Sequence, residues 1–217
     1  PVFAFLHLYE PHTPWDPPAK HAGRASPYDG DVAYADEIVG RFVDSLRSMG
    51  RYDEAVIAIT SDHGEGLGDH GEKEHGIFLY REALHVPLMI RLPKGRNGGR
   101  RVTTTVRQTD IAQTLLDLAA LPALPDTDGE SLVPLMQGPG ADRTAYAESL
   151  YGRLHMGWSE LYAVTEGRNR YIRAPRPEFY DLSTDPLEKN NLIAQRGALS
   201  AQMDAWVVER SAKGAFA

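Results

Sequence analysis

The spacing of apolar and polar residues predicts an α/β arrangement for the first part of the chain. Three short apolar runs that suit buried strands lie at residues 2–8, 55–60 and 86–92. Apolar residues recur at helical spacing from Val32 to Leu46, and Gly50 follows in a C-cap position. A second amphipathic helix follows Thr109 and Asp110, which we expect to cap it. This alternation is typical of a mainly parallel sheet flanked by helices.

The last third of the chain follows a different pattern. Between Leu121 and Gly140 the composition shifts to proline, glycine and aspartate, as in a connection between units. Short strand-like runs then lie at 161–165, 170–173 and 179–182, and a helical pattern covers 192–210. We therefore predict an α/β domain over residues 1–140. A small subdomain over residues 141–217 should combine an antiparallel sheet with a terminal helix.

Composition narrows the function classes. The chain has 217 residues and a formal net charge of −7, which argues against a nucleic-acid surface. It has no cysteine, so these residues form no disulfide, thiolate metal site or cysteine nucleophile. No apolar run reaches the roughly 20 residues of a membrane span, so we expect a soluble protein. Its compartment, bacterial periplasm or cytoplasm, stays open, as does its oligomeric state.

The first candidate site follows the run at 55–60 directly. Asp62 offers a hard oxygen and His63 a nitrogen, and Gly64 and Gly66 allow the chain to turn sharply there. In an α/β sheet, chemistry gathers at the carboxyl ends of the strands. The pair therefore predicts a metal site. The alternative is a turn in which Asp62 caps a helix. Glu65 is interpreted as a residue at a helix start.

Histidines add to this candidate site. His12 lies in a loop stiffened by four prolines after the first predicted strand, and His75 lies in the segment 72–76. We expect both to lie at the same sheet edge as Asp62 and His63. Imidazoles beside a divalent cation suit a phosphate or sulfate ester. The alternatives are that His12 only stabilises its loop and that His75 is a surface residue.

Several motifs in order resemble those of the sulfatases of the alkaline phosphatase superfamily. They are Pro11-His12-Thr13-Pro14, Ser61-Asp62-His63-Gly64-Glu65 with Gly68-Asp69-His70-Gly71, the run from His75 to Leu88, Asp128-Gly129-Glu130-Ser131-Leu132, and the run from Phe179 to Leu192. The resemblance covers essentially the whole chain. It implies part of an alkaline-phosphatase-like α/β fold, with residues 1–140 as the second half of the catalytic domain.

The resemblance also implies roles for individual residues. Asp62 and His63 match the pair that ligates a divalent cation, usually Ca²⁺, with Mg²⁺ or Mn²⁺ as alternatives. His63 stands where many members carry asparagine. His12 matches the histidine that contacts the sulfate or the leaving oxygen. For a further cationic or proton-donating residue, His75 is the first candidate and Lys73 the second.

One expected feature is absent from the sequence. Sulfatases carry a nucleophile, a cysteine converted to formylglycine or a serine, in a Cys/Ser-x-Pro-x-Arg motif, and none is found here. Two interpretations remain, a degenerate relative and a carboxyl-terminal part of a larger enzyme. The strand-like opening run favours the second. We therefore expect formylglycine upstream, and we expect these 217 residues by themselves to be inactive.

The leading functional hypothesis is a sulfuric ester hydrolase that acts on a small sulfate ester or a sulfated glycan. Within the same superfamily, a phosphodiester or phosphonate hydrolase or a phosphoethanolamine transferase is the alternative. From another class, a non-catalytic module could bind sulfated glycans or other anions through the basic loop of Lys94, Arg96, Arg100 and Arg101. The natural substrate stays open.

Overall fold

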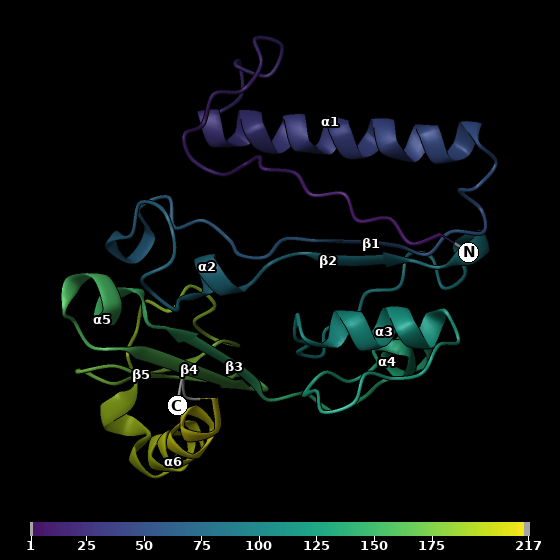
Figure 1. Cartoon of the computed structure of the whole chain (residues 1–217). Helices are drawn as coiled ribbons and strands as arrows, with labels where there is room; N and C mark the ends of the chain where they lie inside the picture. Colours follow the sequence, from purple (N-terminus) through teal and green to yellow (C-terminus); the bar gives the residue numbers. More distant parts are fainter. Residues whose placement is uncertain (1, 215–217) are drawn as a thin grey trace. The chain divides into compact units, whose positions relative to one another are not determined.

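The computed structural model describes residues 2–214, with side chains through residue 212 (Figure 1). The chain divides into two compact units. The first runs up to Ala55 and includes Arg91–Arg96, and the second comprises Val56–Ile90 and the residues from Asn97 onward. None of the helices in the described residues combines the length and apolar character needed to cross a membrane.

The first unit is built on the long helix α1 (Pro27–Ser48). Ser26 caps it, because its hydroxyl accepts a hydrogen bond from the backbone N–H of Asp29 at 3.1 Å. Met49 is the C-cap, and Gly50 follows with φ +64°, a left-handed conformation that suits glycine. The predicted helix is confirmed. It starts earlier than the apolar pattern suggested, because the cap and the proline at its first position carry no apolar signal.

The strand predicted at residues 2–8 is wrong. The segment has no strand assignment, and its apolar side chains are open to solvent, with Val2 95%, Phe3 79% and Phe5 82% exposed. A strand requires a neighbour that takes up its backbone hydrogen bonds. Within the described residues no neighbouring strand pairs with this segment.

The other two predicted strands are present. β1 (Ile57–Thr60) and β2 (Leu88–Arg91) pair in a two-stranded sheet. The chain between them contains a 3₁₀ turn at Asp69–Gly71 and the single-turn helix α2 (Arg81–Leu84). A further 3₁₀ turn at Pro93–Gly95 follows β2. The α/β class is therefore confirmed.

The second sheet has four antiparallel strands in the order β3-β4-β5-β6. They are β3 (Ala145–Ser149), β4 (Leu161–Glu166), β5 (Asn169–Arg173) and β6 (Glu178–Asp181). The last three confirm the prediction. β3 was missed because its sequence, Ala-Tyr-Ala-Glu-Ser, contains residues with little strand preference. It forms because β4 offers a full ladder, from Ala145 opposite Thr165 to Ser149 opposite Leu161.

Both faces of this sheet are buried, and the alternation of side chains along its strands accounts for the two cores. On one face, Val164, Tyr171 and Phe179 pack against Met203 and Val207 of helix α6 (Gly197–Gly214). On the other face, a residue adjacent to each of these three along its strand packs against the segment that leads into α2. This second cluster consists of Leu79, Ala163, Ile172 and Tyr180.

The terminal helix is confirmed, but it begins five residues later than predicted. Residues 193–195 form a 3₁₀ turn instead. Asn191 explains the delay, because its side-chain oxygen accepts from the backbone N–H groups of Phe179 and Ile193 at 3.1 and 2.9 Å. The backbone of Leu192 also donates to the carbonyl of Phe179 at 2.8 Å. The chain is thus tied to β6 before the helix starts.

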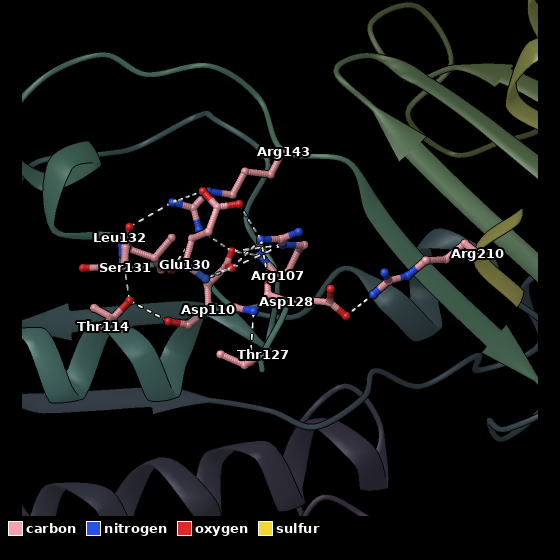
Figure 2. Close-up of polar contacts among 11 residues, drawn as sticks. Arg107, Asp110, Thr114, Thr127, Asp128, Glu130, Ser131, Leu132, Arg143 and Arg210 are labelled. Atoms are coloured by element: carbon pink, nitrogen blue, oxygen red, sulfur yellow. Dashed lines mark hydrogen bonds and ion pairs between the residues drawn. The ribbon is translucent and has the colours of Figure 1, made fainter. Parts of the chain in front are cut away.

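A buried carboxylate anchors helix α3 (Asp110–Leu118), as Figure 2 shows. Thr109 makes no side-chain capping bond, so the prediction that it caps the helix is wrong. Instead the fully buried Asp110 accepts from the backbone N–H of Arg107 at 2.9 Å and from that of Glu130 at 3.0 Å. The guanidinium groups of Arg107 and Arg143 both lie 2.9 Å from its oxygens. Burial alone would raise the pKa of Asp110, but these bonds outweigh it and hold the pKa below its ordinary value.

The same network joins α3 to the rest of the second unit. Helix α4 (Val133–Gln137) follows the segment that carries Glu130, and the hydroxyl of Thr114 accepts from the backbone of Leu132 at 2.8 Å. Arg210 of α6 forms an ion pair with Asp128 (Figure 2). The motif from residue 128 to residue 132 therefore has a structural role.

Candidate active site

The turn after β1 is folded tightly against α2 and the loop at residues 72–75. The backbone N–H of Gly64 donates to the carbonyl of Ala83 at 2.8 Å, and a Cβ at Gly64 would lie 1.9 Å from the carbonyl oxygen of Glu82. The N–H of Gly66 donates to the carbonyl of Glu74 at 2.8 Å, and a Cβ there would lie 2.5 Å from the carbonyl oxygen of Glu72. Only glycine allows these approaches. The turn is therefore held in one conformation.

Asp62 and His63 present their donor atoms on the same side of this turn. Nδ1 of His63 lies 2.8 Å from the carbonyl oxygen of Gly64, so Nδ1 carries the proton and Nε2 the lone pair. Oδ1 of Asp62 accepts from the backbone N–H of His63 at 3.1 Å and lies 3.9 Å from Nε2 of His63. The Asp62 side chain is 83% exposed and thus accessible to an ion.

This geometry fits a shared cation. Ligands of one divalent ion lie roughly 3 to 5 Å apart, because each sits about 2.0–2.6 Å from the metal. The Asp62 oxygen and the His63 nitrogen fall within that range. The carboxylate oxygen of Asp62 suits Ca²⁺, Mg²⁺ or Mn²⁺, whereas the imidazole nitrogen of His63 is a donor that transition-metal ions favour.

His75 is oriented by a buried acid. Its Nδ1 lies 3.2 Å from Oε1 of Glu65, whose side chain is only 5% exposed. The carboxylate can only accept, so Nδ1 of His75 donates and its Nε2 is the second reactive nitrogen. Glu65 does not start a helix, contrary to the sequence interpretation. The chain turns back at Gly66 instead, and this brings Glu65 to His75.

The structure brings His63 and His75 together. Their rings stack with centroids 3.8 Å apart and planes inclined by 23°. His75 follows Glu74, whose carbonyl binds Gly66, so the same backbone contact that shapes the turn also positions the second imidazole. Two imidazoles, one exposed carboxylate and one buried carboxylate therefore meet at one end of β1.

A glutamine that sequence reasoning missed supports the same turn. The side-chain nitrogen of Gln108 donates to the backbone carbonyls of Ser61 and Asp62 at 2.9 and 2.6 Å. Gln108 lies just before α3, which is anchored through Arg107 and Asp110. No local pattern marks this residue, because its role depends on a contact between segments more than forty residues apart.

The two remaining predicted residues, Lys73 and His12, lie in different units of the chain. Lys73 is exposed in the same loop as His75, two residues before it. His12 belongs to the first unit, where its Nδ1 lies 2.6 Å from the carbonyl oxygen of Thr13 and its ring stacks on Tyr9 with centroids 4.8 Å apart. His12 is thus held in the same tautomer as His63 and His75. That it shares one depression with Asp62 stays a prediction.

His70, in contrast, has a structural role. Its Nδ1 lies 2.5 Å from Glu82 and its Nε2 lies 3.0 Å from the backbone carbonyl of Glu188, while its ring stacks on Tyr80 at 3.8 Å. Burial lowers the pKa of His70, but the Glu188 carbonyl and the Glu82 carboxylate outweigh burial and raise the pKa above its ordinary value. The residue ties the loop after the candidate site to the segment at 181–190.

Glu188, in the segment at 181–190, is also buried. Glu188 accepts from the backbone N–H of Arg81 at 2.6 Å and lies 3.0 Å from the guanidinium of Arg170. Burial raises the pKa of Glu188, and Arg170 acts against this rise. These contacts join the motif at 179–192 to the motif at 75–88, because Glu188 binds the backbone of Arg81.

Comparisons with known proteins identify the family of the chain. The sulfatase family model matches residues 1–121, and a model described as N-sulphoglucosamine sulphohydrolase, C-terminal, matches residues 68–211. The chain is 36% identical over 170 residues to a choline-sulfatase of Rhizobium meliloti (strain 1021), which covers 76% of this chain and 32% of that protein. It is 29% identical over 177 residues to an N-acetylglucosamine-6-O-sulfatase of Bacteroides thetaiotaomicron, which covers 77% and 32%.

A solved structure extends the comparison. The phosphonate monoester hydrolase of Agrobacterium radiobacter superimposes with a TM-score of 0.72 and 28% identity, over 86% of this chain and 41% of that chain. The chain thus spans about a third of the length of the curated relatives named above. Because the sulfatase family model matches more than half of its residues, the chain belongs to the sulfatase family.

Proposed function

We propose that the whole protein hydrolyses sulfuric esters and that this chain supplies part of its metal site and its proton-transferring group. The observation that carries the proposal is the cluster of Asp62, His63 and His75 at one end of β1 in a member of the sulfatase family. The Nδ1–H group of each histidine donates to an oxygen acceptor, so Nε2 is the ring nitrogen proposed to act in the chemistry.

Within this proposal the cation is held by Asp62 through its carboxylate and by His63 through Nε2. Ca²⁺ is the first choice, with Mg²⁺ and Mn²⁺ as alternatives. When bound, such an ion supplies positive charge that polarises a sulfuryl oxygen. The nucleophile, formylglycine, would come from outside these residues.

His75 is the proposed proton donor to the departing oxygen. In the protonated ring Nε2 carries a proton that it can transfer, while the Glu65 carboxylate balances the charge on the imidazolium through Nδ1. Lys73 is the second candidate for this role. His12 is proposed to contact the sulfate group or the leaving oxygen through Nε2.

The substrate is proposed to be a small organic sulfate or a sulfated sugar. The names of the two relatives, a choline-sulfatase and an N-acetylglucosamine-6-O-sulfatase, support this range. Hydrolysis of phosphonate monoesters is the second candidate, which the similarity to the Agrobacterium radiobacter enzyme supports. Sulfuryl and phosphoryl transfer place similar demands on charge and geometry, so a comparison of kcat/KM for matched sulfate and phosphonate esters separates the two candidates.

The test uses the protein at its full natural length with 4-nitrophenyl sulfate as substrate. Asp62→Ala should abolish turnover and lower bound cation, and His12→Ala should reduce turnover with the cation retained. Asp53→Ala is the matched control, because Asp53 is 82% exposed, close to the value for Asp62. Unchanged cation content in Asp62→Ala would remove Asp62 from the site. Absence of sulfate ester turnover in the unmodified protein would reject the function.

A further inference from the structure

A cavity of about 370 Å³ opens in the second unit next to the loop that carries His75. It lies between the segment 77–80 and one end of the four-stranded sheet. Its walls are mainly apolar and aromatic. Among the lining residues are Ile77, Phe78, Tyr80, Trp158, Leu161 and Ile172.

Trp158 is a rigid and accessible part of this wall. It is 56% exposed, yet two glycines hold it in place. Gly157 adopts φ +68° at the end of helix α5 (Tyr151–Met156), which reverses the chain, and the backbone N–H of Trp158 then donates to the carbonyl of Gly152 at 3.0 Å. A Cβ at Gly152 would lie 3.3 Å from the Trp158 ring, so the indole packs directly over the glycine backbone.

The cavity borders the loop that carries His75. Ile77 lines the cavity and is only two residues from His75 in the chain. The hydroxyl of Ser149, which also lines the cavity, donates to the carbonyl of Gly76 at 2.8 Å. On the other side, both oxygens of Glu72 accept from the backbone N–H groups of Ile77 and Phe78, at 2.8 and 3.0 Å. These bonds join the rim of the cavity to the His75 loop.

Two charged residues, Arg176 and Glu178, line the cavity, and the carboxylate of Glu178 already accepts hydrogen bonds within it. Oε2 of Glu178 accepts from the hydroxyls of Tyr80 and Tyr180 at 2.9 and 2.6 Å. A ligand therefore meets mostly apolar side chains and the open face of one indole. Such a surface favours a flat or ring-shaped group that stacks on an aromatic side chain.

We propose that this cavity receives the ring of the alcohol part of the sulfate ester and that Trp158 determines the preference for ring-bearing substrates. The inference rests on the proposed sulfatase function. A sulfate group held near His63 and His75 would direct its organic part toward Ile77 and the cavity behind it. The ring belongs to an aryl alcohol or to a sugar, and the two sources share the stacking chemistry.

The experiment compares substrates and inhibitors with the full-length enzyme. In Trp158→Ala, the KM for 4-nitrophenyl sulfate or for N-acetylglucosamine 6-sulfate should rise at least about tenfold, with kcat changed much less, because stacking is lost without a change at the reacting centre. The ester whose KM rises more shows whether the cavity prefers an aryl ring or a sugar ring. The inhibition constant of inorganic sulfate, which has no ring, should stay within about twofold. Trp158→Phe should retain most of the affinity.

Trp206→Ala is the control, because Trp206 is a partly exposed indole on α6 that packs on Tyr146. It should leave KM unchanged for both esters. A KM within twofold of the original for both ring esters in Trp158→Ala, or an equal loss of sulfate inhibition, would overturn the inference. An unmodified enzyme without any sulfate ester turnover would instead reject the proposed function, so the two failures are distinguishable.

Discussion

The carboxylate of Glu65 accepts a hydrogen bond from Nδ1 of His75 at 3.2 Å, and this orients an imidazole that stacks against His63. Glu65 is buried, whereas the side chain of Asp62 is exposed. A buried acid behind a reactive imidazole fixes the orientation of the ring and its tautomer. The pair thus connects the fold of the turn to the proposed proton transfer.

Loss of the charge on Glu65 should therefore slow the reaction more than it weakens substrate binding. In Glu65→Gln, we expect kcat to fall about 10- to 100-fold, with a smaller change in KM. Steady-state kinetics on an aryl sulfate measure both values. Glu74→Gln is the control, because Glu74 lies in the same loop with an exposed side chain. A kcat that is equal in both variants would show that Glu65 does not support His75.

Gln108 should affect cation binding through the backbone of Ser61 and Asp62. Each of its two hydrogen bonds is worth about 1 kcal/mol, so Gln108→Ala should raise the Kd of the cation by up to about 30-fold. Calorimetric titration of the cation-free protein measures this value. Gln113→Ala is the matched control, because Gln113 also bonds twice to backbone, at Leu124. It should lower the free energy of unfolding and leave the Kd unchanged. The same Kd in both variants would argue against a positioning role for Gln108.

Gly64 should tolerate no side chain. A Cβ at this position would meet the Glu82 carbonyl oxygen at 1.9 Å, so Gly64→Ala must displace the turn or α2. We expect a loss of at least about 2 kcal/mol in the free energy of unfolding, measured by urea denaturation. In Gly40→Ala a Cβ meets nothing within 4 Å inside α1, and we expect a gain of about 0.5–1 kcal/mol. Equal stability of the two variants would contradict the close contact.

Asp110 should make stability depend on pH in the acid range. Its folded pKa lies below the ordinary value of 3.8, so its stabilising contribution is complete above that value and is lost as pH falls through the folded pKa. Asp110→Asn should cost about 3–5 kcal/mol at pH 7, because Arg107 and Arg143 lose a buried partner. At pH 3 the difference from the unmodified protein should be smaller. Urea denaturation at both pH values measures this, and a constant difference would contradict the assignment.

Some features could be predicted from local sequence. The alternation at 161–182 and the helical spacing from Val32 to Leu46 correspond to β4, β5, β6 and α1. The pair Asp62 and His63 was placed at the end of β1 for the same reason. These features depend only on residues close together in the chain, so the spacing of apolar residues is enough to predict them.

Other features could not be predicted in this way. The run at 2–8 has the composition of a strand but no pairing neighbour, and β3 has weak strand residues but a full partner in β4. Strand formation is a property of a pair of segments, and a single segment carries only half of the information.

For this protein, the sequence by itself determined the helices α1, α3 and α6, the strands β1, β2 and β4 to β6, the family motifs and the residue types of the candidate site. Only the tertiary structure decided that Glu65 orients His75, that Gln108 bonds to the backbone of Asp62, and that His70 is structural. The physical reason is distance along the chain. Local periodicity reports which face of an element is apolar, whereas hydrogen bonds between remote side chains form only when packing brings the segments together.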